Sequence, residues 1–242
     1  MPTRVDEIAP DTFRISTFHP EFGIQFNQFL VRDEEPLLMH TGMRRMFEAT
    51  RDAVSRLIDP ARLAWIGFSH FEPDECGALN EWLAVAPRAQ AAGGPVASMV
   101  MLSDFADRAP RMLAPGEVLD TGSHRLRFLS TPHLPHGWDA GLYYDESCGT
   151  LFCSDLLFQP GDPEPVTEDD PVPIVRQAII AGLAGPLAHD IPYTHRTDAM
   201  LHELAALTPR TLAIMHGASY RGDGGKVLAD FAVVLRETIG PD

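Results

Sequence analysis

The sequence has few cysteines and no long apolar run, and each of these shortages excludes a class of protein. Its 242 residues include three cysteines, Cys76, Cys148 and Cys153, and no two are spaced as C-x-x-C. They cannot form a closed disulfide framework, so a reducing compartment fits best. No apolar run approaches a membrane span, and the N-terminus carries acidic residues where a signal peptide needs basic ones. We therefore expect a cytoplasmic protein.

Positive charge is also scarce. Nineteen Lys and Arg residues stand against 34 Asp and Glu residues, which gives a formal net charge of −15. Such a surface repels phosphate backbones and anionic lipid headgroups, so neither nucleic acid nor a membrane is expected as a partner. Hydrophobic residues make up 45% of the chain, enough to bury a core without a disulfide. We expect one domain over residues 1–242.

The hydrophobic pattern changes period several times along the chain. Alternating or β-rich runs predict strands at residues 13–18, 23–32, 36–42, 63–68, 118–120, 124–130, 141–144, 150–153 and 211–215. Helical spacing predicts helices at residues 43–58, 77–86, 175–188, 197–207 and 226–237. Prolines and acids between residues 159 and 173 predict a solvated loop. Two blocks of strands, each followed by helices, predict an α+β fold with two mixed sheets packed face to face and helices outside.

One loop concentrates side chains that could bind metal. His70, Glu72, Asp74 and Glu75 fall within six positions, directly after the predicted strand 63–68. So much acid beside a buried strand costs free energy unless a cation compensates it. The alternative is a solvated helix start, because acidic residues near a helix N-terminus complement its dipole and Pro73 suits the first turn.

Similar residue types occur where other predicted strands end. His133, His136 and Asp139 follow the strand 124–130, Asp155 follows the strand 150–153, and His216 follows the strand 211–215. Each alone has an ordinary explanation, such as a helix cap or a histidine bonded to the backbone. Four strand ends can nevertheless converge on one cleft, so the set as a whole predicts a metal site.

In this order the residues resemble the metallo-β-lactamase fold superfamily, and within it the flavodiiron and oxygen-binding diiron proteins. Residues 70–74 match the family motif H-x-E-x-D-H up to its last histidine, which Glu75 replaces. Residues 136–139 echo the family's histidine, tryptophan and aspartate, residues 151–155 its strand before a bridging aspartate, and residues 214–221 its final ligand loop. The resemblance implies a four-layer αββα sandwich.

The resemblance also implies two sets of metal ligands. One metal would be bound by His70, Glu72 and His136, and the other by Asp74, His216 and Glu75. Asp155 would bridge the two metals, which makes seven expected ligands. Glu75 would either bind the second metal or point at an open position on it. His133 competes with His136, and we favour His136. The histidine that does not bind, together with Trp138 and Tyr220, is expected to surround the ligands.

The resemblance implies two iron ions as cofactors, with manganese or zinc as alternatives, because the hydrolytic members have histidine where Glu72 stands. The chain would bind dioxygen or nitric oxide, and reduce it with electrons from a separate donor such as a flavoprotein. We expect no flavin bound by the chain itself, and a homodimer is left open. The alternatives are a dioxygen sensor without turnover, a dinuclear metal-dependent hydrolase, and a chain that keeps the fold without productive metal chemistry.

Overall fold

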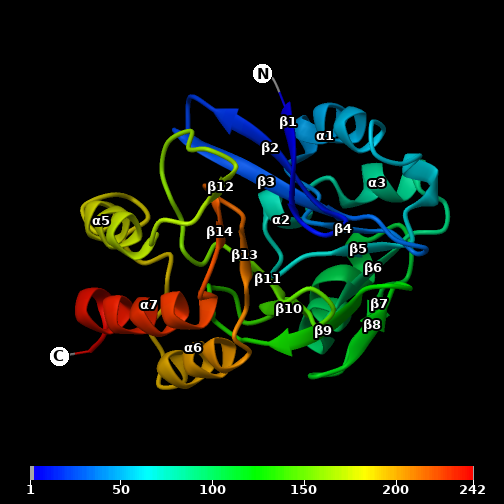
Figure 1. The fold of residues 1–242 in the computed structure, drawn as a ribbon. Coiled ribbons are helices and arrows are strands. Elements are labelled where there is room, and N and C mark those ends of the chain that lie inside the picture. The colour runs from blue at the N-terminus through cyan, green and yellow to red at the C-terminus, as the bar shows by residue number, and fades with distance from the viewer. Residues whose placement is uncertain (1–2, 242) are drawn as a thin grey trace.

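The computed structural model describes residues 3–241, and its centre is a pair of seven-stranded sheets packed face to face (Figure 1). The N-terminal sheet contains, in spatial order, β1 (Thr3–Ala9), β2 (Thr12–His19), β3 (Ile24–Val31), β4 (Leu37–Met39), β5 (Trp65–Gly67), β6 (Gln90–Gly93) and β7 (Arg111–Met112). The C-terminal sheet contains β12 (Val166–Thr167), β14 (Ser219–Arg221), β13 (Thr211–Ile214), β11 (Thr150–Ser154), β10 (Gly141–Asp145), β9 (Arg125–Ser130) and β8 (Val118–Asp120). Both sheets are mixed, as predicted.

Helices cover the outer faces of the two sheets (Figure 1). Those in the first half of the chain are α1 (Phe47–Val54), α2 (Pro73–Cys76), α3 (Leu79–Val85) and α4 (Ser103–Phe105), with short helical turns η1 (Arg44–Met46), η2 (Pro60–Arg62) and η3 (Ala97–Leu102). The C-terminal sheet is flanked by α5 (Val172–Gly182), α6 (Thr197–Ala206) and α7 (Gly224–Ile239). Within residues 3–241 none of these helices combines the length and the hydropathy that crossing a membrane requires.

Three buried apolar clusters separate the four layers. Because side chains alternate along a strand, Phe29 and Val31 of β3 face the C-terminal sheet, while Leu30 between them faces the helices outside. In β13, Ala213 lies in the cluster between the sheets and Leu212 in the cluster under α6 and α7. Every layer therefore buries apolar surface on each side that meets another layer, and the αββα prediction is confirmed.

The differences from the sequence prediction lie mostly at sheet edges. The prediction missed β1, β6, β7, β12 and β14, and two of these strands are only two residues long. Strand β1 carries the charged residues Arg4, Asp6 and Glu7, which obscure its alternation. Strand β12 falls inside the predicted loop 159–173, and α5 ends at Gly182 rather than residue 188. Short or charged edge strands have too little apolar periodicity to be recognised without their neighbours.

Strand direction brings the chemistry-bearing loops together. β11 and β13 are parallel, and β9 runs in the same direction because both β9 and β11 pair antiparallel with β10. The carboxyl ends of these three strands therefore lie at one edge of the C-terminal sheet. His136, Asp155 and His216 all follow these carboxyl ends.

Candidate metal centre

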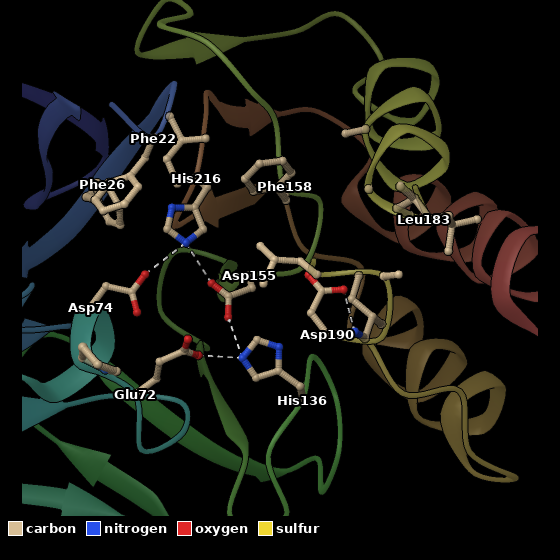
Figure 2. A pocket seen from close by; sticks show the side chains of 18 of the residues that line it. Phe22, Phe26, Glu72, Asp74, His136, Asp155, Phe158, Leu183, Asp190 and His216 are labelled. Carbon is tan, nitrogen blue, oxygen red and sulfur yellow. Dashed lines mark hydrogen bonds and ion pairs between the residues drawn. The ribbon is translucent and has the colours of Figure 1, made fainter. Parts of the chain in front are cut away.

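The loop after β5 supplies three side chains from five consecutive residues. β5 is buried at its end, and after Phe71 the chain enters α2, which begins at Pro73 with Glu72 in an extended conformation before it. Proline suits the first position of a helix because its missing N–H has no partner there in any case. Figure 2 shows Glu72 and Asp74 pointing into the same cavity.

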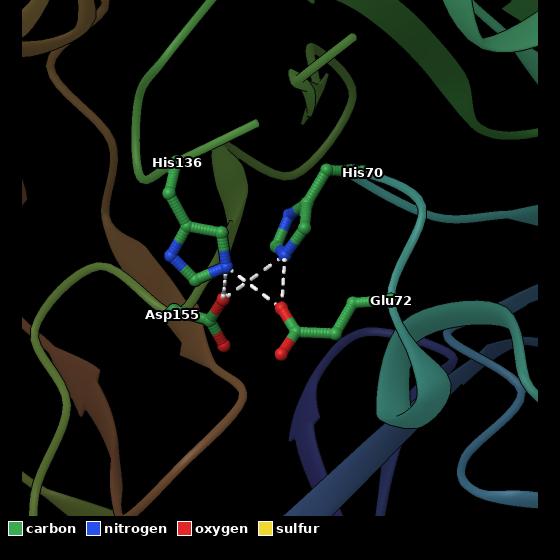
Figure 3. A group of neighbouring side chains, drawn as sticks. All are labelled: His70, Glu72, His136 and Asp155. Atoms are coloured by element: carbon green, nitrogen blue, oxygen red, sulfur yellow. Dashed lines mark hydrogen bonds and ion pairs between the residues drawn. The ribbon is translucent and has the colours of Figure 1, made fainter. Parts of the chain in front are cut away.

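The first group of donor atoms consists of His70, Glu72, His136 and Asp155 (Figure 3). Glu72 Oε2 lies 2.9 Å from His70 Nε2 and 2.7 Å from His136 Nε2. Asp155 Oδ2 lies 3.4 Å from each of the same two nitrogen atoms. Two imidazoles and two carboxylates thus direct one atom each at a common point.

The second group consists of Asp74, Asp155 and His216. His216 Nε2 lies 3.0 Å from Asp155 Oδ1 and 3.4 Å from Asp74 Oδ2 (Figure 2). Asp155 belongs to both groups and offers Oδ2 to the first and Oδ1 to the second. If each group held a cation, Asp155 would contact both.

Backbone contacts fix the tautomer of His216. Its Nδ1 lies 2.9 Å from the carbonyl oxygen of Gln25 and donates to it, which leaves Nε2 to accept a metal ion. Asn27 donates to the carbonyls of Ile214 and Gly217, at 2.8 Å each, and so holds this loop against β3. Gly217 has φ +120°, and a Cβ there would lie 2.5 Å from the Cβ of Gln159, so only glycine fits.

A second contact joins the loop of His136 to the loop of His70. Asp139 accepts a hydrogen bond of 2.8 Å from the backbone N–H of Phe71, and the N–H of Gly141 donates to the carbonyl of Ser69. Gly137, with φ +77°, passes so close to His70 that a Cβ would lie 3.2 Å from that of His70. The two imidazole rings consequently meet edge to face, with centroids 4.2 Å apart.

The charges of the centre shift the pKa values of its members. Burial alone would lower the pKa of His70, but the charges of Glu75 and Asp155 and the contact with Glu72 raise it to about 9. For His216 the opposing effect of burial is again overcome, by hydrogen bonds to Asp155 and Asp74, and the pKa rises to about 10. Hydrogen bonds from His136 and His70 hold the pKa of Glu72 well below its usual range. When no metal ion is bound, the positive charges of the protonated imidazoles thus offset the negative charges of the carboxylates.

The structure does not bring Glu75 into either group. Its side chain is 0% exposed, and its carboxylate contacts His40 Nδ1 at 2.6 Å, the N–H of Ser69 at 2.8 Å and the hydroxyl of Ser154. Consecutive helical residues point about 100° apart, so when Asp74 faces the cavity Glu75 must face the interior. Its Oε1 lies 3.8 Å from His70 Nδ1, whereas the carboxylates of the first group approach His70 at Nε2. The expectation that Glu75 binds or faces the second metal therefore does not match the geometry.

Sequence reasoning missed His40, the buried partner of Glu75. His40 directly follows β4, with φ +65°, and its N–H donates to the carbonyl of Gly67. The sequence did not single it out, because His40 falls inside the predicted strand 36–42, whereas the other histidines follow the ends of predicted strands. The contact of His40 with Glu75 was also not predictable, because it depends on how β4 and β5 pair.

The other expected residues lie outside both groups. His133 is exposed, with φ +67°, whereas His136 belongs to the first group. Trp138 is 54% exposed and lines no part of the cavity, and Tyr220 is buried in the core beneath α6 and α7. Of the seven expected ligands, the structure brings together six: His70, Glu72, Asp74, His136, Asp155 and His216.

The centre opens into a cavity of about 550 Å³ whose wall is mainly apolar. The wall includes Phe22, Phe26, Phe158 and Leu183, which Figure 2 labels, together with Ile179 and Ile191. Asp190 lies at its exposed rim, where partial burial and the charge of Asp155 raise the pKa of the Asp190 carboxyl. No pattern in the sequence indicated that α5 and residues 187–191 would form part of this wall.

The donor set fits two metal ions. Three carboxylates and three imidazoles, with no sulfur, suit iron, manganese or zinc. Two divalent cations would replace the imidazolium protons in offsetting the charges of Glu72, Asp74 and Asp155. Fold and site together define an αββα protein with two adjoining groups of candidate metal ligands.

Comparison with known proteins identifies the family. A family model described as ODP family beta lactamase matches residues 24–217, which is most of the chain. The chain belongs to this family, the metallo-β-lactamase-like diiron domain of flavodiiron proteins, and the resemblance noted in the sequence is confirmed.

Curated and solved relatives agree with this assignment. The diflavin flavoprotein A 1 of Synechocystis is 31% identical over 147 residues, which span 58% of this chain and 25% of that protein. Rubredoxin oxygen:oxidoreductase from Desulfovibrio gigas superposes with a TM-score of 0.78 at 17% identity, over 95% of this chain and 62% of that one. The flavodiiron protein from Giardia intestinalis gives 0.79 at 16%, over 98% and 60%. The chain spans less than a third of the length of its first curated relatives.

Proposed function

We propose that this chain binds two iron ions and uses them to bind and reduce dioxygen or nitric oxide, with electrons from a separate donor such as a flavoprotein. The observation that carries the proposal is the position of Asp155, whose two oxygens serve two different groups of donors. Glu72 supports iron over zinc, because a hard oxygen ligand in place of a third imidazole stabilises the ferric state. Rubredoxin oxygen:oxidoreductase, which shares the fold, is named for a reaction with oxygen.

In this proposal the first iron is bound by His70, Glu72 and His136 and the second by Asp74 and His216, with Asp155 shared. The second group offers one ligand fewer. An ion in the second group would therefore rely more on ligands from outside the protein than an ion in the first. When bound, the two ferrous ions supply two electrons and the Lewis acidity that dioxygen reduction requires.

The protein's own residues prepare the site for this chemistry. The apolar wall of the cavity favours an uncharged diatomic molecule over water and anions, because it offers few hydrogen-bonding groups. Asp190 at the rim is the group we assign to carrying protons inward, since its raised pKa lets it retain a proton closer to neutral pH. The carbonyl of Gln25 holds His216 with Nε2 directed at the centre throughout the reaction.

Iron analysis and oxygen uptake test the proposal. Protein expressed with added iron should contain two iron ions per chain, and a content near zero, or zinc alone under iron-replete conditions, would reject the iron assignment. Chemically reduced protein alone should consume about one dioxygen per centre, because two ferrous ions hold two electrons. With a reductase and a flavoprotein added, uptake should continue.

Two other outcomes would replace the proposal. Reversible colour change on exposure to air, without net uptake in the complete assay, would indicate a dioxygen sensor. Hydrolysis of an ester or thioester without redox activity would indicate a hydrolase of the same fold. Asp190→Asn serves as the internal comparison: it should keep both irons and slow turnover, and the difference from the parent should shrink as the pH rises and Asp190 of the parent loses its proton.

A further inference from the structure

A second cluster of metal-binding side chains lies at the other end of β11. It consists of His124, directly before β9, Asp145, the last residue of β10, and Cys148, in the turn between β10 and β11. His124 Nδ1 lies 2.5 Å from Asp145 Oδ2, and Cys148 Sγ lies 3.1 Å from the same oxygen. Their three donor atoms all lie within 4.8 Å of one another. Backbone pairing of adjacent strands, rather than sequence proximity alone, assembles this cluster.

This cluster is separate from the diiron centre. β11 begins beside Cys148 and ends beside Asp155, and five residues of strand span roughly 17 Å at ~3.3 Å each. The cluster borders a different surface hollow, of about 920 Å³, whose lining includes Ser123, Ser147 and Arg210. An ion bound here would therefore have its own access to solvent.

The donors differ in kind from those of the diiron centre. Thiolate, imidazole and carboxylate are the three side-chain ligands of zinc, and the thiolate is a poor partner for hard cations such as Mg²⁺. A thiolate and a carboxylate together carry two negative charges, which a divalent cation would offset. The diiron centre, with three carboxylates and no cysteine, is the harder set of the two.

The local structure already orients these donors. Asp145 Oδ1 accepts a hydrogen bond of 2.9 Å from the N–H of Ser147, which leaves Oδ2 directed at His124 and Cys148. Ligands on one tetrahedral zinc lie roughly 3.3 to 3.6 Å apart. Since His124 Nδ1 and Asp145 Oδ2 lie 2.5 Å apart, binding an ion would require them to separate by somewhat less than 1 Å. His124 and Asp145 are buried, and Cys148 is half-buried at the edge of the hollow.

We propose that His124, Asp145 and Cys148 form a mononuclear zinc site, independent of the diiron centre, with its fourth coordination position open to the surface hollow. Three protein ligands and one exchangeable position are the composition of an open zinc site rather than a closed structural one. This proposal does not rest on the function proposed for the diiron centre.

Zinc titration of the full chain tests it. The parent for the experiment carries His70→Ala and Asp155→Ala, which remove donors from both diiron groups, so that Zn²⁺ bound at equilibrium reports on the second cluster. We expect one zinc per chain. Cys148→Ser in this background should weaken binding by at least about 100-fold, since even the partners behind zinc ligands contribute ~10- to 100-fold.

A matched control removes a charge nearby without touching the donors. Asp120 is an exposed carboxylate on β8 that pairs with Arg125, next to His124 in the chain. Asp120→Asn should bind zinc as the parent does, whereas Asp145→Asn should not. Substitution of Co²⁺ should give a thiolate-to-metal charge-transfer band that Cys148→Ser lacks. A parent that binds no zinc, or a Cys148→Ser variant that binds it equally well, would overturn the proposal.

A measurement on the unmodified chain covers the case in which the variants do not fold. Cys148 is the accessible cysteine among the three, because Cys76 and Cys153 are buried. Zn²⁺ should slow the alkylation of Cys148, measured by peptide mass spectrometry, while Cys76 and Cys153 stay unreactive with or without zinc. Alkylation of Cys148 at an unchanged rate in saturating zinc would also overturn the proposal.

Discussion

The two sheets contribute to the candidate metal centre in different ways. The N-terminal sheet supplies His70, Glu72 and Asp74 from a single loop after β5. The C-terminal sheet supplies His136, Asp155 and His216 from three loops that are far apart in the chain. The first set is positioned by local geometry, the start of α2, whereas the second depends on the register of β9, β11 and β13. Changing one donor should therefore have local effects, except at Asp155, which belongs to both donor groups.

Asp155→Ala should have the largest effect, the loss of both metals. Without the shared carboxylate each group has one donor fewer, and nothing offsets the repulsion between two cations. Elemental analysis after iron-supplemented expression measures the content. Asp169→Ala, which removes an exposed carboxylate from the loop before α5, is the control and should keep two metals. Full metal content in Asp155→Ala would show that Asp155 does not bridge.

His136→Ala should remove one metal and leave the other. His136 belongs only to the first group, so the ion held by Asp74, Asp155 and His216 keeps its donors. His133→Ala, three residues away on the same loop, is the matched comparison and should leave both metals in place because His133 is exposed and outside the group. The opposite pattern, with more metal lost from His133→Ala, would exchange the two assignments.

Glu75→Gln should lower stability while the metal content stays at two. Glu75 accepts hydrogen bonds from Ser69 and Ser154 and pairs with His40 in the interior, and weakening charge-assisted bonds of this kind costs about 1–3 kcal/mol. Thermal unfolding of the metal-free protein measures the loss. A variant of normal stability that has lost one metal would place Glu75 among the ligands after all.

Metal binding should release protons at neutral pH. The pKa values of about 9 for His70 and about 10 for His216 keep both protonated in the metal-free chain, and a ligand must be deprotonated. Affinity should therefore rise with pH, and the release should vanish above about pH 10. Calorimetric titration in two buffers with different ionisation enthalpies counts the protons. Release of none at pH 7 would contradict these shifts.

The same groups make the stability of the metal-free chain depend on pH. Their pKa values are raised above the ordinary 6.5, so the stability they confer is fully present below that pH and is lost as the pH rises through 9 to 10. Metal-loaded protein, in which the imidazoles carry no proton, should lack this decline. Thermal unfolding of both forms across pH 6.5 to 10 provides the comparison.

Residue periodicity and residue type were enough to predict the fold class and most of the donors. Alternation and helical spacing identified the long elements, and the cluster at residues 70–75 was visible because its members are neighbours in the chain. His136, Asp155 and His216 could be proposed because each follows a predicted strand. That these three residues meet at one edge of a sheet was a hypothesis, since local periodicity does not encode strand order and direction.

Which adjacent side chains point towards the same cavity became clear only in the folded chain. In α2, Asp74 points into the cavity and Glu75 points into the interior, towards His40. The sequence alone does not distinguish these two adjacent acidic residues. The loop after β9 directs His136 inward and leaves His133 exposed. The cluster of His124, Asp145 and Cys148 escaped notice because hydrogen bonding between β9 and β10 brings His124 beside Asp145, 21 residues later. Side-chain direction and strand register are properties of packing, and no local pattern specifies them.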